Sequence, residues 1–170
     1  MSNSNIHLIR WTKDNWQEFK AIRLQAVGDR PDVFLSSYET TLAQPDNYWI
    51  DTLTSLDGAV FGLYDGATII GLTGVFRYRE SPQDTAILGM SYIDPAYRGR
   101  GLSRMFYEAR INWARAQDGI IRVIVSHRAG NDASRAANQA FGFVSTGQST
   151  KIYGDGQEAI NHEYELRWEK

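Results

Sequence analysis

A glycine- and arginine-rich segment, "RGRGLSR" (98–104), lies between an apolar run and a helical pattern. Gly99 and Gly101 are two residues apart and have arginines beside them. Where a strand turns into a helix, the first amides of the helix have no intrahelical partner and its dipole favours an anion. Glycines let the anion approach these amides closely. The segment therefore predicts a turn that binds a phosphate or pyrophosphate, or a tight turn that needs glycine for shape alone.

The spacing of this segment excludes two common phosphate motifs. The segment has no Gly-Lys-Ser/Thr after a four-residue spacer, so it is not a P-loop. It also lacks the third glycine and the later acidic residue of the dinucleotide-binding fingerprint. The turn alone therefore leaves both interpretations open.

The elements around the turn predict a mixed α/β fold, with a central twisted sheet and helices on both faces. Asp65-Gly66 between two apolar runs predicts a hairpin. A strand at 85–93, a helix at 101–116 and a strand at 120–126 form one parallel crossover unit. No composition shift or linker divides the chain, so we expect one domain over residues 1–170. The other expected elements are a strand at 6–11, a helix from 14 to about 28, a short helix from 46, a helix at 131–141 and two closing strands at 143–150 and 162–168, whereas 32–44 is ambiguous.

Composition restricts the partners that the chain is expected to have. The net charge is −2, so no overall basic field favours nucleic acid. The chain has no cysteine, which fits a reducing cytoplasm, and its three histidines are far apart in the sequence, which argues against a metal site. No run approaches the roughly 20 apolar residues of a membrane span. We therefore expect a cytoplasmic protein without metal, nucleic acid or membrane partners.

Two blocks of the sequence together resemble the GNAT superfamily of N-acetyltransferases. "DPAYRGRGLSRMFYEA" (94–109) resembles the acyl-CoA-binding motif of that family, and "NDASRAANQAFGF" (131–143) resembles its later helix, which ends in Gly-Phe. The order of strands and helices matches the acyl-CoA N-acyltransferase fold over nearly the whole chain. The resemblance implies acetyl-CoA as co-substrate and a primary amine, small or peptidic, that attacks it directly in a ternary complex. Members often form dimers, so a homodimer is one expected state.

The resemblance also implies a cofactor-binding site. The backbone around Tyr92 and Ile93 would pair with the pantetheine arm of CoA. A bulge near 89–91 would splay this strand from the next one and leave its main-chain groups free. The CoA pyrophosphate would lie on the turn residues Arg98, Gly99, Arg100, Gly101, Leu102 and Ser103.

The later helix departs from the family at one position. Many members carry a tyrosine general acid four residues before Gly-Phe, and this chain has Asn138, which has no titratable proton. Asn131, Ser134 and Asn138 are spaced i, i+3, i+7, which predicts a polar stripe that faces the cofactor cleft, although Asn131 could instead only cap the helix. Asn138 also favours an alternative function, an acyl-CoA-binding sensor with reduced catalysis. The residues expected to pack on the sheet are Ala133, Ala136, Ala137, Ala140 and Phe141.

Four candidates for proton transfer follow, each with a structural alternative. Ser134 could donate a proton and Asn138 a hydrogen bond. His127 follows the central strand, and the ordinary pKa of a histidine suits a general base, but the residue could also be a surface histidine. Glu39 could deprotonate the amine, or be a solvated side chain on a helix. Tyr153 and Asp155, in a late loop, could line the acceptor site.

Overall fold

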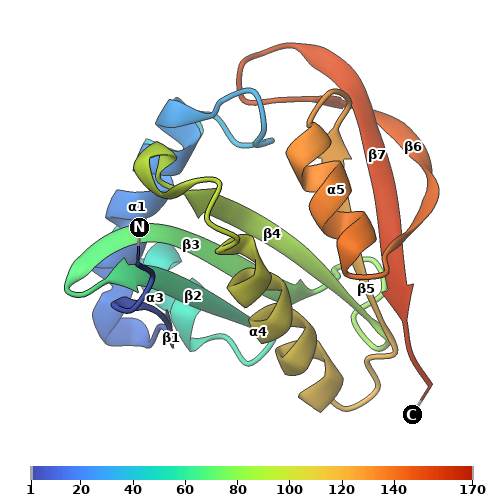
Figure 1. Ribbon diagram of the computed structural model, residues 1–170, viewed down its shortest axis with the longest axis horizontal. Helices are drawn as coiled ribbons and strands as arrows, with labels where there is room; N and C mark the ends of the chain where they lie inside the picture. Colours follow the sequence, from blue (N-terminus) through green and yellow to red (C-terminus); the bar gives the residue numbers. More distant parts are fainter. Residues whose placement is uncertain (1, 170) are drawn as a thin grey trace.

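The computed structural model describes residues 2–169 as a seven-stranded sheet with helices on both faces (Figure 1). The strand order is β1-β2-β3-β4-β5-β7-β6. The strands are β1 (Ile6–Arg10), β2 (Gly58–Asp65), β3 (Thr68–Arg77), β4 (Thr85–Ile93), β5 (Arg122–Arg128), β6 (Val144–Ile152) and β7 (Glu158–Arg167). The helices are α1 (Trp16–Asp29), α2 (Tyr38–Leu42), α3 (Asp46–Thr54), α4 (Ser103–Ala116) and α5 (Asp132–Ala140). The predicted mixed α/β class is confirmed.

The turns form where the sequence requires them. Gly66 has a φ of +58°, and the antiparallel pairing of β2 with β3 begins at Asp65, so the predicted hairpin is confirmed. β4 and β5 are parallel neighbours joined through α4, as the crossover unit requires. The ambiguous segment 32–44 contains only the short helix α2, which Ser37 caps by accepting from the Thr40 amide at 3.1 Å.

The alternation of side chains along β2 places a core on each face of the sheet. Ala59 and Phe61 pack with residues of α4, whereas Val60 and Tyr64 pack with residues of α1 and α3. Figure 1 shows α4 and α5 on the near face of the sheet and α1 with α3 behind it. The two cores hold α1 and α4 against the same strands, and both helices reach the end of β4. Within residues 2–169, no helix combines the length and the apolar composition of a membrane span.

The middle of the sheet is split. β4 and β5 pair only from Thr85 with Arg122 to Ile87 with Ile124, although both strands continue beyond these pairs. On its other side, β4 shifts register against β3, so that Met90 and Ser91 together oppose one residue of β3. Met90 has a φ of +59°, the left-handed conformation that a bulge of this kind can require. The predicted bulge at 89–91 is therefore confirmed, and β4 diverges from β5 beyond it.

Candidate functional site

The turn between β4 and α4 presents unpaired backbone amides. Gly99 and Gly101 have φ angles of +75° and +73°, and no atom lies within 4 Å of the position that a Cβ would take at either residue. Among the described residues, no acceptor is bonded to the amides of Gly99, Gly101, Leu102 or Ser103. Helix α4 also begins without a side-chain cap or an acidic residue in its first turn. The first amides of α4 thus lack acceptors beside a turn with open space at its glycines, which is the arrangement of an anion site.

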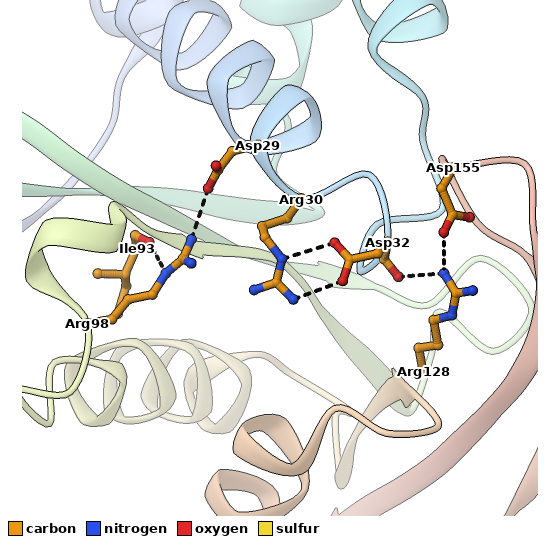
Figure 2. A network of polar contacts seen from close by, with 7 residues as sticks. All are labelled: Asp29, Arg30, Asp32, Ile93, Arg98, Arg128 and Asp155. Carbon is orange, nitrogen blue, oxygen red and sulfur yellow. Dashed lines mark hydrogen bonds and ion pairs between the residues drawn. The ribbon is translucent and has the colours of Figure 1, made fainter.

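The side chains of Arg98 and Arg100 are engaged elsewhere in the protein, so they add less positive charge to the anion site than their positions in the sequence suggest. Arg98 donates from Nε to the Ile93 carbonyl at 2.8 Å and from Nη2 to Asp29 at 3.1 Å (Figure 2). Its side chain therefore links β4 to the end of α1 and turns away from the amides. The carbonyl of Ile93, expected to pair with pantetheine, already accepts a hydrogen bond. Arg100 stacks over Tyr97, with its Cζ 4.7 Å from the ring centroid.

A second arginine network lies across the split. Arg30, just after α1, binds Asp32 through two hydrogen bonds of 3.0 Å. Arg128, at the end of β5, donates to the Asp155 carboxylate at 2.7 Å and to the Asp32 carbonyl at 3.0 Å. Figure 2 shows these side chains in a row from the end of β4 to the end of β5. A cavity of about 240 Å³ lies beside this network and is lined in part by Asn131 at the start of α5.

Helix α5 turns a polar face to the sheet. Asn138 is only 1% exposed, accepts from the Tyr107 hydroxyl and lies 3.5 Å from Nδ1 of His127. Asn131 caps the helix by accepting from the Ser134 amide at 3.2 Å. The prediction that the alanines of this helix pack on the sheet was wrong at Ala133, Ala136 and Ala140, which are exposed. The helix instead turns Asn138 inward, because polar partners for it lie on the side of the sheet.

Of the three residues of the stripe, Asn131 and Ser134 are partly exposed and Asn138 is not. Asn138 is therefore enclosed by Tyr107 and His127, and its contact with the cofactor stays a prediction. Tyr107, on α4, was missed by sequence reasoning. Its helical spacing predicts an ordinary aromatic residue of the core. What sets it apart from other core aromatics is its buried hydroxyl, which donates to Asn138, at the position where many family members carry tyrosine.

His127 is buried, not a surface histidine. Its ring stacks on Tyr164 with a centroid separation of 5.3 Å and lies 5.5 Å from that of His162. Burial lowers the pKa of His127, and the charges of His162 and Arg135 lower it further. The lowered pKa keeps the buried side chain neutral at pH 7, and its role as a base stays a prediction.

We expect acid to destabilise the protein through His127. Because the folded-state pKa lies below the unfolded value of about 6.5, the neutral ring contributes stability above that pH, and this is lost as pH falls through the folded pKa. Urea unfolding between pH 7 and pH 5 should show a smaller loss of stability for His127→Gln than for the natural protein. Asp32 and Asp155, whose pKa values are lowered by hydrogen bonds from arginines, act only below about pH 4. Equal slopes for the two proteins would contradict this assignment.

The other candidates are scattered around the split. Glu39 is exposed on α2, far in sequence from the bulge. Tyr153 is buried, donates to Asn161 at 3.0 Å and has Arg128 over its ring. Asp155 lines the cavity beside the arginine network, so of the two loop residues only Asp155 has its polar group at a cavity.

A larger cavity lies on the opposite face of the bulge from α4. It measures about 490 Å³ and was not anticipated from the sequence. Met90 of the bulge and Phe76 form one wall, and α3 forms the other with Tyr48 and Asp51. These α3 residues carry no motif, so only the fold could bring them to the bulge.

Comparisons with known proteins agree with this geometry. The acetyltransferase (GNAT) family model matches residues 10–143. The chain is 27% identical over 118 residues to the N-alpha-acetyltransferase RimI of Mycobacterium tuberculosis, a match that covers 69% of this chain and 65% of that protein. The chain therefore spans just under two thirds of the length of this relative.

Two solved structures show the same fold. The ribosomal-protein-S5-alanine acetyltransferase of Vibrio fischeri superposes with a TM-score of 0.80 at 15% identity, over 100% of this chain and 98% of that one. The yncA protein of Salmonella typhimurium, solved with its cofactor acetyl-CoA, superposes with a TM-score of 0.78 at 20% identity, over 98% and 96% of the two chains. Because the family model covers most of the sequence, the chain belongs to the acetyltransferase (GNAT) family.

Proposed function

We propose that this protein is an acetyl-CoA-dependent N-acetyltransferase that acts on a primary amine. The observation that carries the proposal is the set of unpaired amides of Gly99, Gly101, Leu102 and Ser103, next to a strand that has separated from its neighbour. A pyrophosphate would satisfy these amides and would complement the uncapped N-terminus of α4. Family membership makes acyl-CoA the natural source of that pyrophosphate.

The residues present fit the rest of CoA as well. Beyond Ile87, the edge of β4 that faces β5 has no strand partner, so its main-chain groups are available to the amide groups of a pantetheine arm. Gly89 has open space on its Cβ side, which leaves room beside the strand. Met90 then lies where the arm would end, between the split on one side and the 490 Å³ cavity on the other.

Acetyl-CoA supplies an activated acetyl thioester, and the chain supplies position and charge. The amine would enter through the cavity, where the exposed Asp51 carboxylate attracts an ammonium group. Loss of the ammonium proton to water, to Asp51 or to Glu39 would leave the free amine that attacks. Ser134, half-buried on α5, is the hydroxyl we assign to the leaving thiolate, because Asn138 is enclosed and cannot donate a titratable proton.

The test is release of free CoA thiol over a panel of amines that contains amino acids, amino acid amides, polyamines, aminoglycosides and peptides. We expect thiol release with at least one class and initial-rate lines that intersect, as direct attack in a ternary complex requires. Thermal shift should show stabilisation by acetyl-CoA, about 2.7 kcal/mol when the ligand is present at 100 times its Kd. Stabilisation without thiol release for any amine would favour the sensor function, and no stabilisation would contradict both.

A further inference from the structure

A buried arginine lies behind the bulge of β4, on the α4 face of the sheet. Arg110 of α4 is only 2% exposed, and burial lowers its pKa to about 10, so the guanidinium is still charged at neutral pH. Its Nε donates to the Phe106 carbonyl at 3.1 Å, and its Cζ lies 4.9 Å from the centroid of the Tyr107 ring. Within residues 2–169, no carboxylate forms an ion pair with Arg110. Because burying a charge without a counter-ion is costly, this arginine is a candidate for a role in the reaction.

Ser91 of the bulge connects Arg110 to the surface. Nη1 of Arg110 donates to the Ser91 hydroxyl at 2.8 Å. Ser91 is exposed, whereas its two hydrogen-bond partners, Arg110 and Thr73, are buried. The side chains of Met90 and Ser91 lie on opposite faces of the sheet, since Met90 lines the 490 Å³ cavity and Ser91 is bonded to α4. The Ser91 hydroxyl is therefore the exposed end of a buried, positively charged group.

The hydrogen bond between Thr73 and Ser91 determines where the Ser91 hydroxyl donates. Thr73 is 0% exposed, and its hydroxyl lies 2.8 Å from that of Ser91, its one hydrogen-bond partner in the part of the chain that the structure describes. If Ser91 donated to Thr73, the buried hydrogen of Thr73 would have no acceptor, which is unfavourable. Thr73 therefore donates, and Ser91 accepts from both Thr73 and Arg110. The hydrogen of Ser91 is left for an acceptor on the exposed side of the bulge.

Ser91 lies on the face of the sheet from which acetyl-CoA is proposed to approach. The amides proposed for the pyrophosphate are at the start of α4, and Arg110 is seven residues beyond Ser103 in this helix, roughly 10 Å along its axis. A pantetheine arm that follows β4 from these amides to the bulge brings the thioester to Ser91. The cavity proposed for the amine lies on the other face, beside Met90. The thioester would thus have Ser91 on one side and the amine on the other.

We propose that Ser91 is a catalytic residue that donates a hydrogen bond to the thioester carbonyl oxygen, with Arg110 and Thr73 as its positioning residues. This deepens the proposed function and rests on it. When the amine attacks the thioester carbon, the carbonyl oxygen takes the π electron pair and becomes negative. When the C–S bond breaks, this pair forms the carbonyl again; the nitrogen gives one proton to water, and the departing sulfur receives one through Ser134. Ser91 keeps its own proton, and its fixed hydroxyl and the charge behind it stabilise the negative oxygen.

Thiol release with the best acceptor of the amine panel tests the role of the hydroxyl. Ser91→Ala should lower kcat by about 100-fold, the usual effect of removing one oxyanion donor. KM for acetyl-CoA should change little, because the hydrogen bond strengthens in the transition state. Ser91→Thr keeps a hydroxyl and should restore most of the rate, and Ser145→Ala, at an exposed serine of β6, should keep the natural kcat. An unchanged kcat in Ser91→Ala overturns the proposal.

A double-mutant cycle tests whether Arg110 acts through Ser91. Arg110→Met removes the charge and should lower kcat at least about tenfold. The double variant with Ser91→Ala should be no slower than Ser91→Ala alone, because the charge reaches the substrate only through the hydroxyl. Losses that multiply in the double variant would contradict the role of Arg110 as a positioning residue for Ser91.

The vibration of the bound thioester separates this proposal from the proposed function. Acetyl-CoA labelled with carbon-13 at the carbonyl is bound without any amine, and infrared difference spectroscopy records its C=O stretch. A hydrogen bond from Ser91 weakens the C=O bond, so the band should lie at lower frequency in the natural protein than in Ser91→Ala. Binding of acetyl-CoA with the same band in both proteins overturns this proposal and leaves the proposed function intact. Absence of acetyl-CoA binding to the natural protein overturns both.

Discussion

Gly101→Val is expected to weaken acetyl-CoA binding by at least about 100-fold, or about 2.7 kcal/mol. Gly101 has a φ of +73°, where a β-branched residue is strongly disfavoured, so the turn must relax to another conformation. Relaxation moves the amides of Gly101, Leu102 and Ser103 away from a common point, and the pyrophosphate loses several charge-assisted hydrogen bonds. Isothermal titration with acetyl-CoA measures the loss. The fold should survive, because a Cβ at Gly101 meets no atom within 4 Å.

Gly142→Val is the matched control for Gly101→Val. Gly142 follows α5 with a φ of +84°, and a Cβ there would lie 3.8 Å from the nearest side-chain atom, so the backbone strain is similar. Both variants should lose a comparable amount of stability, of the order of 1–2 kcal/mol. Only Gly101→Val should lose affinity for acetyl-CoA. Equal affinities in the two variants would place the pyrophosphate elsewhere.

Asn138→Ala is expected to destabilise the protein by about 2–4 kcal/mol. The substitution removes buried atoms and leaves the Tyr107 hydroxyl without its acceptor in a closed environment. Burial raises the pKa of Tyr107, so ionisation cannot relieve the loss at neutral pH. Urea unfolding gives the value, and Gln139→Ala, on the exposed side of the same helix, should change stability by less than about 0.5 kcal/mol.

A double-mutant cycle decides between a structural and a catalytic Asn138. With Tyr107→Phe as the second change, the double variant should be more stable than the sum of the single losses predicts, by about 1 kcal/mol or more, because the contact can be lost only once. If Asn138 instead served the departing thiolate, Asn138→Ala would lower kcat by more than tenfold with little effect on stability, and the cycle would show no coupling.

Short sequence motifs predicted most of the fold, because the residues of each motif themselves determine the local structure. Asp65 and Gly66 accept the backbone conformation of the tight turn between β2 and β3. The parallel crossover unit at 85–126 was predicted from two apolar strands and the amphipathic helix between them. The bulge at 89–91 was expected from the family resemblance and is present. The apolar pattern of α5 predicted that its alanines face the sheet, and this was wrong. The hydrogen-bond partners of the buried Asn138 come from α4 and β5, which are distant from α5 in sequence, so the pattern within α5 could not reveal them.

The proposed acetyl-CoA site could be predicted from the sequence, whereas the cavity proposed for the amine could not. Gly99 and Gly101 lie within one short motif, so their joint role is visible in the order of residues. Tyr48, Phe76 and Met90 belong to three different elements and meet only through the packing of α3 against the sheet. Arg98 shows the reverse case: its place in the motif suggested phosphate, while the fold directs its side chain to Asp29.

The split sheet has a mechanical consequence. Strands β1 to β4 form one half-sheet and β5, β7 and β6 form the other, and within residues 2–169 the halves pair as strands only from Thr85 with Arg122 to Ile87 with Ile124. We infer that this joint acts as a hinge, because strand pairing holds the two halves together at one end and is absent from the other. We infer that the spacing at the open end is set by contacts of the C-terminus of α1 and the segment after it, from Asp29 to Arg98 on one half and from Asp32 to Arg128 on the other. The polar contacts of Figure 2, with the backbone bonds from Gly154 to Phe34 and from Asp155 to Pro31, therefore connect the two half-sheets at their open end.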